Sequence, residues 1–395
     1  MDTAATVENL LESVNDIAHI MRKHAPEAEW NRSLSPEVVQ AMVGAGLFRM
    51  WVPKVFGGLE LDPMTAFRVI EEVARIDGAA AWNLQISISA GSVCALFTND
   101  TPREIFGTTP DVLFAAAFSP PAQVVPVDGG YRLNARWSFG SGCQFAAWFA
   151  GPAVVMENGE PRISEAGSPT MIAILFPADD VEILDTWHTL GMRGTGSQDF
   201  IAKDVFIPEH RATSLALPDK PTAAYSGPLY RFGIWHTIAA LVPPALGIAR
   251  AAIDELITVA KGKTPRFTST TLRERQVVQA QVAQAEALLG AGRAYLHEAL
   301  RDGWETVTQG RIITFDQKVK LQLASTYAVQ AAVQAVDLAH SAAGATAIRE
   351  ESPLARCFRD IHTMSGHAFV SASRYESVGQ VLLGLNSEWE GWFAL

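Results

Sequence analysis

The chain has 395 residues, of which 48% are hydrophobic and 18% are charged, and its formal net charge is −11. This length suits about two or three domains, and the composition excludes a disordered or low-complexity protein. An acidic chain repels phosphate backbones, so we expect no nucleic acid among its partners. The most apolar stretch, near 237–253, is broken by Pro243 and Pro244 and falls short of the roughly 20 residues of a membrane span. We therefore expect no membrane partner.

Cysteine usage and the N-terminus indicate the compartment. Cys94, Cys143 and Cys357 stand far apart and form no C-x-x-C pair, which suits a reducing environment. The first residues carry neither a basic segment nor an apolar one, unlike a signal peptide. We expect a cytoplasmic protein.

The first 110 residues follow a helical pattern. Leu10, Val14 and Met21 belong to an apolar series at three-to-four-residue spacing. Ser35-Pro36 and Asp62-Pro63 each place a capping oxygen directly before a proline, which is typical of a helix start. These signals predict an N-terminal α-helical domain over residues 1–110.

Residues 111–220 change to a strand pattern. The stretch 127–133 contains Asp128-Gly129 and then alternates, as in a hairpin. Two apolar runs, 170–176 and 200–207, each stop at a proline. Short strands separated by turn signals predict a middle β-domain, built as a small barrel or sandwich.

Residues 221–395 return to a helical pattern. Four long stretches are predicted, near 232–261, 272–303, 313–343 and 353–384. Alanine pairs such as Ala331-Ala332 allow helices to pack closely. These lengths predict a C-terminal four-helix bundle.

Two glycine-rich segments carry polar side chains that could hold a flat ligand. In the loop 190–199, glycines allow close backbone approach and Arg193 could bind a phosphate, although a simple tight turn has the same composition. In the segment 136–142, Trp137 and hydroxyl groups stand beside Gly140, an environment that suits the edge of a flavin. A buried core tryptophan is the alternative interpretation.

Two histidines, His362 and His367, lie five residues apart in the last helical stretch. On a helix this spacing turns the side chains about 140° apart, so we expect one pocket to use only one of them. No carboxylate or thiol completes a metal-binding set with them, so we expect no metal. The chain also lacks a dinucleotide fingerprint, a Walker loop and a hydrolase elbow.

Taken in order, these segments resemble the acyl-CoA dehydrogenase superfamily over nearly the whole chain. The resemblance is carried by residues 52–58, 136–142, 190–195, 204–208, 342–344, 353–356 and 359–360. It implies an α+β multidomain protein with the acyl-CoA dehydrogenase fold: an N-terminal helical domain, a middle β-barrel and a C-terminal four-helix bundle. It also implies a homotetramer, with a flavin between the β-domain and the bundle. The segment that reaches a neighbour's flavin would include Arg266, Phe267 and Gln276, although Thr264 and Thr268 replace the arginine and glycine of the family pattern.

The same resemblance separates two kinds of chemistry. Most dehydrogenases of the family carry a catalytic glutamate eight residues after the aspartate of an Arg-Asp pair, and here that position is Ala368. Other members place the glutamate on the first bundle helix, where this chain has Thr237. Glu376 remains a distant substitute. The missing carboxylates favour an oxygenase.

The pattern is similar to the two-component flavin monooxygenases of this fold, such as the oxygenase components of p-hydroxyphenylacetate hydroxylase, steroid-phenol hydroxylase and dibenzothiophene monooxygenase. In them a histidine and a serine serve the substrate and the C4a-hydroperoxyflavin, and His367 and Ser141 match those positions. The histidine is expected to act as a general base. The histidine that these enzymes often carry on an N-terminal helix is absent from 87–92, which leaves the substrate open.

The resemblance thus implies hydroxylation of a small aromatic or heteroaromatic molecule by O2 and reduced FMN or FAD, which a separate flavin reductase supplies. The residues expected to shape the flavin site are Trp137, Gly140, Arg193, Gly194, Thr195, Gly196 and Ser197. Two alternatives stay open: an acyl-CoA dehydrogenase with an unusual base, and a non-catalytic ligand-binding member of the fold.

Overall fold

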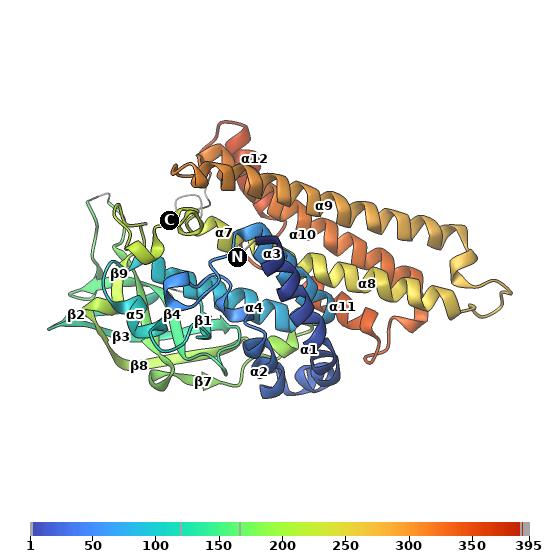
Figure 1. Ribbon diagram of the computed structural model, residues 1–395, viewed down its shortest axis with the longest axis horizontal. Helices are drawn as coiled ribbons and strands as arrows, with labels where there is room; N and C mark the ends of the chain where they lie inside the picture. Colours follow the sequence, from blue (N-terminus) through green and yellow to red (C-terminus); the bar gives the residue numbers. More distant parts are fainter. Residues whose placement is uncertain (1–2, 119–120, 166, 388, 390–395) are drawn as a thin grey trace.

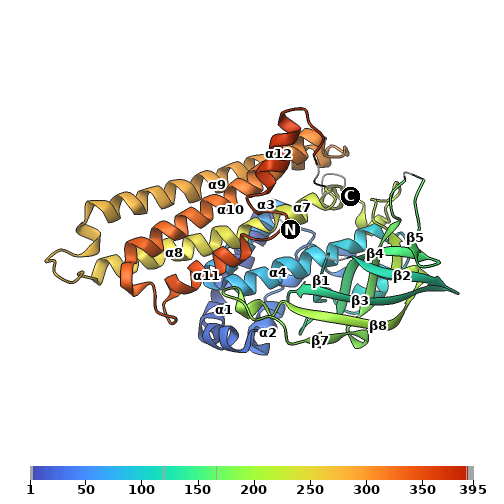
Figure 2. The same ribbon diagram turned by 180° about the vertical axis from the view of Figure 1, so that it is seen from behind.

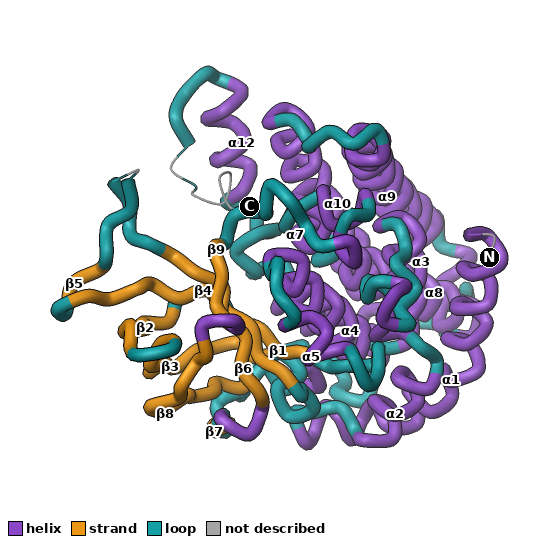
Figure 3. Tube along the Cα trace, turned by 60° about the vertical axis from the view of Figure 1, so that its left-hand side comes forward, coloured by secondary structure: helices purple, strands orange, loops and turns teal. Residues whose placement is uncertain are grey.

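A computed structural model of the chain describes residues 3–118, 121–165, 167–387 and 389. Met1 and Asp2, which belong to the segment compared with a signal peptide, lie outside the described residues. Among the described residues, helices form the N-terminal and C-terminal parts and strands form the middle (Figure 1). The strands gather on one side of the molecule and the helices on the other (Figure 3).

The N-terminal part is helical, as predicted. Its helices are α1 (Thr3–Asn31), α2 (Pro36–Gly44), α3 (Pro63–Ile76), α4 (Gly78–Gly91) and α5 (Thr101–Phe106). Both predicted caps are confirmed: the Ser35 side chain accepts from the amide of Val38, and the Asp62 side chain accepts from the amide of Thr65. Helix α4 is almost entirely buried. It runs through the centre of the molecule between the sheet and the bundle (Figure 2).

The middle part is one mixed sheet. Its strands are β1 (Phe114–Ala116), β2 (Ala122–Val127), β3 (Gly130–Gly140), β4 (Trp148–Glu157), β5 (Glu160–Pro161), β6 (Met171–Pro177), β7 (Glu182–Leu184), β8 (Gln198–Pro208) and β9 (Ala212–Ser214). The pairing order is β7-β8-β3-β2-β4-β6-β9, with β1 and β5 also paired to β4. The predicted hairpin is confirmed, because β2 and β3 pair antiparallel across Asp128-Gly129. Pairing of β1 and of β2 with β4 is parallel.

The C-terminal part is a helix bundle with two short helices before it. Its helices are α6 (Pro228–Arg231), α7 (Trp235–Ala239), α8 (Val242–Gly262), α9 (Gln276–Thr308), α10 (Phe315–Ala343), α11 (Pro353–Met364) and α12 (Arg374–Leu382). The domain limits at 110/111 and 220/221 remain a proposal. Both positions fall between regular elements.

Two of the four predicted bundle helices are interrupted. The stretch 232–261 breaks before Val242, because Pro243 and Pro244 occupy the first turn of α8 and prolines cannot continue a preceding helix. The stretch 353–384 breaks after Met364, where Ser365-Gly366 has low helix propensity. His367 therefore lies in a connection between helices. The prediction that His362 and His367 lie about 140° apart on one helix was wrong for that reason.

Two segments, Gly78–Leu96 and Trp235–Gly262, are long and apolar enough to cross a membrane. However, 78% and 83% of their most apolar windows are buried inside the folded chain. Their hydrophobic character is therefore explained by their place in the core.

Candidate active site

The site is centred on Trp82, a residue that the sequence analysis did not single out. Its indole Nε1–H donates a hydrogen bond of 3.0 Å to Oγ of Ser141, which follows directly after β3. Its ring also meets the ring of His367 edge-on, with 5.6 Å between centroids. Trp82 thus joins the two residues that were expected to be catalytic.

Ser141 belongs to a chain of buried hydroxyl groups. Its Oγ lies 2.7 Å from Oγ of Ser197, which lies 2.6 Å from Oγ1 of Thr195. The Thr195 hydroxyl in turn donates to the carbonyl of Met192 at 2.8 Å. The strand register explains the meeting, because Gly140 at the end of β3 pairs with Gln198 at the start of β8. Three residues expected from the two glycine-rich segments are therefore in direct contact.

Two glycines of the 190–199 loop are required where they stand. Gly196 has a φ of +54°, and a Cβ there would lie 2.4 Å from Nε2 of Gln144. A Cβ on Gly194 would lie 3.1 Å from Cβ of Ala79 and 3.2 Å from Cβ of Ala28. These distances are tighter than ordinary side-chain contacts, so Gly194 lets the loop pack closely against α1 and α4, and Gly196 lets it pack against Gln144.

Trp137 and Gly140 lie deeper than a ligand-binding role would suggest. The Trp137 side chain is only 1% exposed, and its ring stacks on those of Phe176 and Phe200 at 5.6 and 5.0 Å. A Cβ on Gly140 would lie 2.6 Å from the ring of Phe200. Both residues support the sheet core behind Ser141. Direct contact with a flavin stays a prediction for them.

A buried group of charges holds the same loop from the other side. The amide of Met192 donates to the carboxylate of Asp360 on α11. Arg356 makes an ion pair of 3.0 Å with Asp77, the residue before α4, and lies 3.5 Å from Asp360. Burial raises the pKa of Asp360 to about 7. The cluster fastens the loop to α4 and α11.

Arg193 points away from Ser141 and toward α1. Its Nε donates to the backbone carbonyl of Glu29 at 3.0 Å. The Glu29 carboxylate is itself paired with Arg359 at 2.9 Å. Within one chain Arg193 therefore ties the loop to α1, and its contact with a phosphate stays a prediction.

His367 is half-buried and sits between two aromatic rings, those of Trp82 and Phe369. Burial lowers its pKa to about 4, so the ring is neutral near pH 7. The amide of Phe369 donates to Nδ1 at 3.4 Å, which places the hydrogen of the neutral ring on Nε2. This geometry favours a hydrogen-bond donor at Nε2 over the general base expected from the resemblance.

His362 has different surroundings. It lies on α11, is exposed, and contacts a carboxylate oxygen of Asp337 at 2.8 Å. Its ring packs on Phe358, with 4.4 Å between centroids. Of the two histidines, only His367 contacts Trp82, the residue that is hydrogen-bonded to Ser141.

Neither family position for a glutamate base holds a carboxylate. Ala368 is exposed beside His367, and the Thr237 hydroxyl donates to the carbonyl of Ile234 at 2.7 Å. Glu376 lies in the first turn of α12 and is exposed. Among the described residues, neither Ser141 nor His367 is hydrogen-bonded to a carboxylate. The site cannot remove a proton with a carboxylate in these contacts.

Three buried amide oxygens on α4 and in the connection after β3 have no hydrogen-bond partner among the described residues: those of Asn83, Gln85 and Gln144. Asn83 and Gln85 follow Trp82 on α4, and Asn83 faces Gly142. Gln144 lies against Gly196. Because buried acceptors need donors, these oxygens suit a flat ligand with ring N–H groups, as a flavin has. No periodicity in the sequence marks Asn83 and Gln85, since α4 has no separate polar face.

The remaining expected flavin residues lie elsewhere in this chain. Arg266 and Phe267 are in the connection from α8 to α9, at the end of the bundle far from the sheet (Figure 1), and Gln276 is the first residue of α9. The Phe267 ring is 93% exposed, with the Arg266 guanidinium 5.0 Å from its centroid. Within one chain these residues do not meet Ser141.

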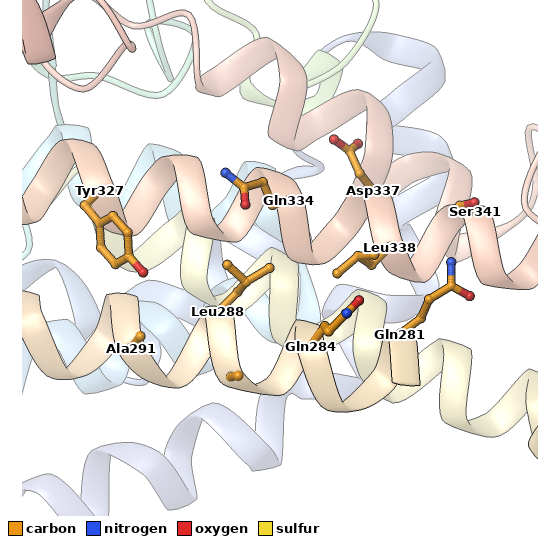
Figure 4. Close-up of a pocket in the computed structure, with 10 residues that line it drawn as sticks. Gln281, Gln284, Leu288, Ala291, Tyr327, Gln334, Asp337, Leu338 and Ser341 are labelled. Atoms are coloured by element: carbon orange, nitrogen blue, oxygen red, sulfur yellow. The ribbon is translucent and has the colours of Figure 1, made fainter. Parts of the chain in front are cut away.

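An open groove of about 760 Å³ lies along α9 and α10, away from the hydroxyl chain (Figure 4). Its lining includes Leu288, Ala291, Tyr327 and Leu338. It contains none of the residues of the candidate active site.

Comparison with known proteins places this geometry in a family. The family of acyl-CoA dehydrogenase N-terminal domains matches residues 5–105, and the family of acyl-CoA dehydrogenase C-terminal domains matches residues 239–372. Indole-3-acetate monooxygenase of Pseudomonas putida is 33% identical, over 95% of this chain and 93% of its own length. The flavin-dependent monooxygenase oxygenase subunit HsaA of Mycobacterium tuberculosis is 29% identical, over 91% of each chain.

Two solved structures resemble the structure of this chain over nearly its whole length. The crystal structure of the HsaA monooxygenase from M. tuberculosis has a TM-score of 0.86 at 27% identity, covering 96% of this chain and 98% of its own. XiaF from Streptomyces sp., in complex with FADH2 and glycerol, has a TM-score of 0.90 and covers 98% of both chains. Its 24% identity shows a shared fold.

Proposed function

Because this chain belongs to the acyl-CoA dehydrogenase superfamily, in its branch of flavin-dependent monooxygenases, we propose that it hydroxylates a small aromatic or heteroaromatic molecule with reduced flavin and O2. One observation carries the proposal beyond the family. Ser141, Trp82 and His367 form one contact group that contains no carboxylate base. Such a group can orient polar ligands but cannot perform the proton removal that an acyl-CoA dehydrogenase needs.

The chain's own residues supply hydrogen-bonding groups for a flavin ring. When bound, the reduced ring supplies the electrons that activate O2. Ser141 would accept from a ring N–H, and the orphaned oxygens of Asn83 and Gln144 would accept from others. The Nε2–H of His367, whose ring contacts that of Trp82, would donate a hydrogen bond to the ligand. FMN and FAD share the ring, so these contacts serve either one.

The surroundings of His367 suit an aromatic substrate. Trp82 and Phe369 lie on the histidine with ring centroids 5.6 and 5.7 Å away. Aromatic faces and edges favour flat aromatic partners over flexible acyl chains. The indole-3-acetate named for the 33% identical relative is of this class, and we propose a substrate of the same chemical kind.

A separate reductase and a second copy of the chain complete the proposed system. The electrons come from a flavin reductase, because no dinucleotide-binding motif is present in the sequence. Helix α9 exposes a row of small residues, Ala283, Ala287, Ala291 and Ala294, which allows another helix to approach closely. We propose a homotetramer in which Arg266, Phe267 and Gln276 contribute to a neighbour's flavin site. We also propose that the protein works in the cytoplasm.

The deciding experiment supplies reduced flavin, ¹⁸O-labelled O2 and indole-3-acetate or a simple phenol. We expect one labelled oxygen atom in the organic product. A parallel reaction offers acyl-CoA and an artificial electron acceptor, where we expect no turnover. Acyl-CoA oxidation without labelled product would support the dehydrogenase alternative. Absence of flavin binding in either redox state would support the non-catalytic alternative.

A further inference from the structure

The hydroxyl chain beside Trp82 has a fixed direction, because its two ends have only one possible role each. An indole N–H can only donate, so Ser141 Oγ accepts from Trp82 at 3.0 Å. A backbone carbonyl can only accept, so the Thr195 hydroxyl donates to Met192 at 2.8 Å. These two ends determine in which direction each hydroxyl group between them donates its hydrogen.

The direction follows in two steps. The Thr195 hydroxyl has one hydrogen and donates it to the Met192 carbonyl, so in the 2.6 Å contact with Ser197 the Ser197 hydroxyl must be the donor. The single hydrogen of the Ser197 hydroxyl is thereby donated to Thr195, so in the 2.7 Å contact between Ser141 and Ser197 the Ser141 hydroxyl must be the donor. In the part of the chain that the structure describes, Ser141 has no other acceptor. What Ser141 retains for a ligand is a lone pair.

We propose that Ser197 and Thr195 are positioning residues that hold the Ser141 hydroxyl as a hydrogen-bond acceptor toward the bound flavin. The proposal rests on the proposed function, since it concerns the flavin of that site. A flavin gains a hydrogen on its central ring nitrogen N5 when it is reduced, which turns an acceptor into a donor. With that nitrogen placed against Ser141, an accepting hydroxyl would match the reduced ring, whereas the oxidised ring would present a second lone pair to it.

The three hydroxyl groups are well protected from solvent. Ser141, Ser197 and Thr195 are 5%, 4% and 1% exposed. Water therefore has little access to exchange these hydrogen bonds for others, and each mismatch retains its cost. The donor and acceptor roles that are set at Thr195 therefore extend through Ser197 and Ser141 to the bound ligand.

Two substitutions break the order in different places. In Ser197→Ala the Ser141 hydrogen loses its acceptor and turns toward the ligand. In Thr195→Val, which keeps the shape of the side chain, the Ser197 hydrogen turns back to Ser141 and displaces the hydrogen of Ser141 outward. Ser197→Thr retains the hydroxyl and should preserve the order. Ser168→Ala, at an exposed turn between β5 and β6, is the matched control.

The measurement is the Kd of reduced and of oxidised flavin, each titrated without oxygen by flavin absorbance and fluorescence. We expect the ratio of oxidised to reduced Kd to fall about tenfold in Ser197→Ala and in Thr195→Val, the size of one net hydrogen bond. Ser197→Thr and Ser168→Ala should keep the parent ratio. This readout does not depend on turnover.

Other outcomes overturn the proposal. Equal weakening of both redox states would show that the hydroxyls only support the fold, while the proposed function would stand. A tenfold lower ratio of oxidised to reduced Kd in Ser197→Thr would show that the hydroxyl group of residue 197 does not set the preference for reduced flavin. If Ser197→Ala does not fold, the shape-conserving Thr195→Val decides. A parent protein that binds neither form of flavin would overturn both this proposal and the proposed function.

Discussion

The backbone amide of Met192 donates a hydrogen bond of 2.5 Å to the carboxylate of Asp360, which lies on α11. The carbonyl of the same Met192 ends the hydroxyl chain by accepting from Thr195. A Cβ on the neighbouring Gly191 would lie 2.1 Å from the carbonyl oxygen of Arg359, so loop and helix are in backbone contact. The C-terminal bundle thereby sets the position of the loop that orders Ser141.

Replacing Asp360 by alanine should loosen this attachment and destabilise the protein. Asp360 is 2% exposed, and its loss leaves the Met192 amide without its acceptor and removes one ion-pair partner of Arg356. We expect the free energy of unfolding to fall by about 3 kcal/mol, as for other buried ion-pair partners. Urea unfolding of the parent protein and of Asp360→Ala measures this difference in the free energy of unfolding. Asp100→Ala, which removes an exposed partner of Arg103, should cause no measurable change, and equal effects in both variants would contradict the argument.

His367 is predicted to act by donating a hydrogen bond from Nε2. His367→Ala should lower hydroxylation by about 10²–10³-fold, the usual loss for one preorganised donor. The consumed oxygen should then appear as hydrogen peroxide while flavin still binds. His367→Gln offers an amide N–H in a similar place and should recover part of the coupling between oxygen consumed and product formed.

The two histidines provide the control for that prediction. His362 contacts Asp337 at the surface, so His362→Ala should leave coupling near the parent value. If His367→Gln is no better than His367→Ala, the donor role is wrong and the general-base role regains support. If all three variants couple as well as the parent protein, His367 is only structural.

The pH dependence of stability should report a second buried histidine, His236. Its Nδ1 contacts the carbonyl of Gly233 at 2.6 Å, and burial lowers its pKa from 6.5 to about 4. Between pH 6.5 and 4 the unfolded chain therefore binds a proton that the folded chain does not. The free energy of unfolding falls as pH decreases through this window, with a contribution from His236 of roughly 1 kcal/mol per pH unit.

Comparison with His236→Gln isolates this contribution. His367 acts in the same direction, whereas the raised pKa of Asp360 lowers stability as pH rises toward 7, so the parent curve alone is a sum. The difference between parent and His236→Gln removes both terms. His19→Gln, on an exposed face of α1, should leave the slope unchanged. Parallel curves for parent and His236→Gln would refute the assignment.

Local signals in the sequence predicted much of the fold. The caps at Ser35 and Asp62 and the hairpin turn at Asp128-Gly129 depend on neighbours within a few residues, and all three are confirmed. The break after Met364 was missed because Ser365-Gly366 is a weak stop signal and the apolar pattern continues beyond it.

The site was only partly predictable. Ser141, Thr195 and Ser197 were identified one by one, but their contact depends on the β3–β8 register. Trp82 gave no signal, because its partner Ser141 is 59 positions away and α4 is buried nearly all round, with no separate polar face. Contacts of this kind arise from tertiary packing, which no local pattern contains.

Assembly provides the last prediction. Ala291 is exposed on α9 and lines the open groove beside α10, where Leu288 and Leu338 also lie (Figure 4). If a second copy packs a helix there, Ala291→Arg places a long charged side chain in the contact and should dissociate the proposed tetramer. Light scattering at micromolar concentration would then give a smaller mass for Ala291→Arg, while Ser168→Arg at an exposed turn keeps the parent mass. Because Phe267 and its neighbours would leave the partner's flavin site, flavin Kd should rise together with dissociation. A parent protein that is monomeric and fully active would refute the shared site.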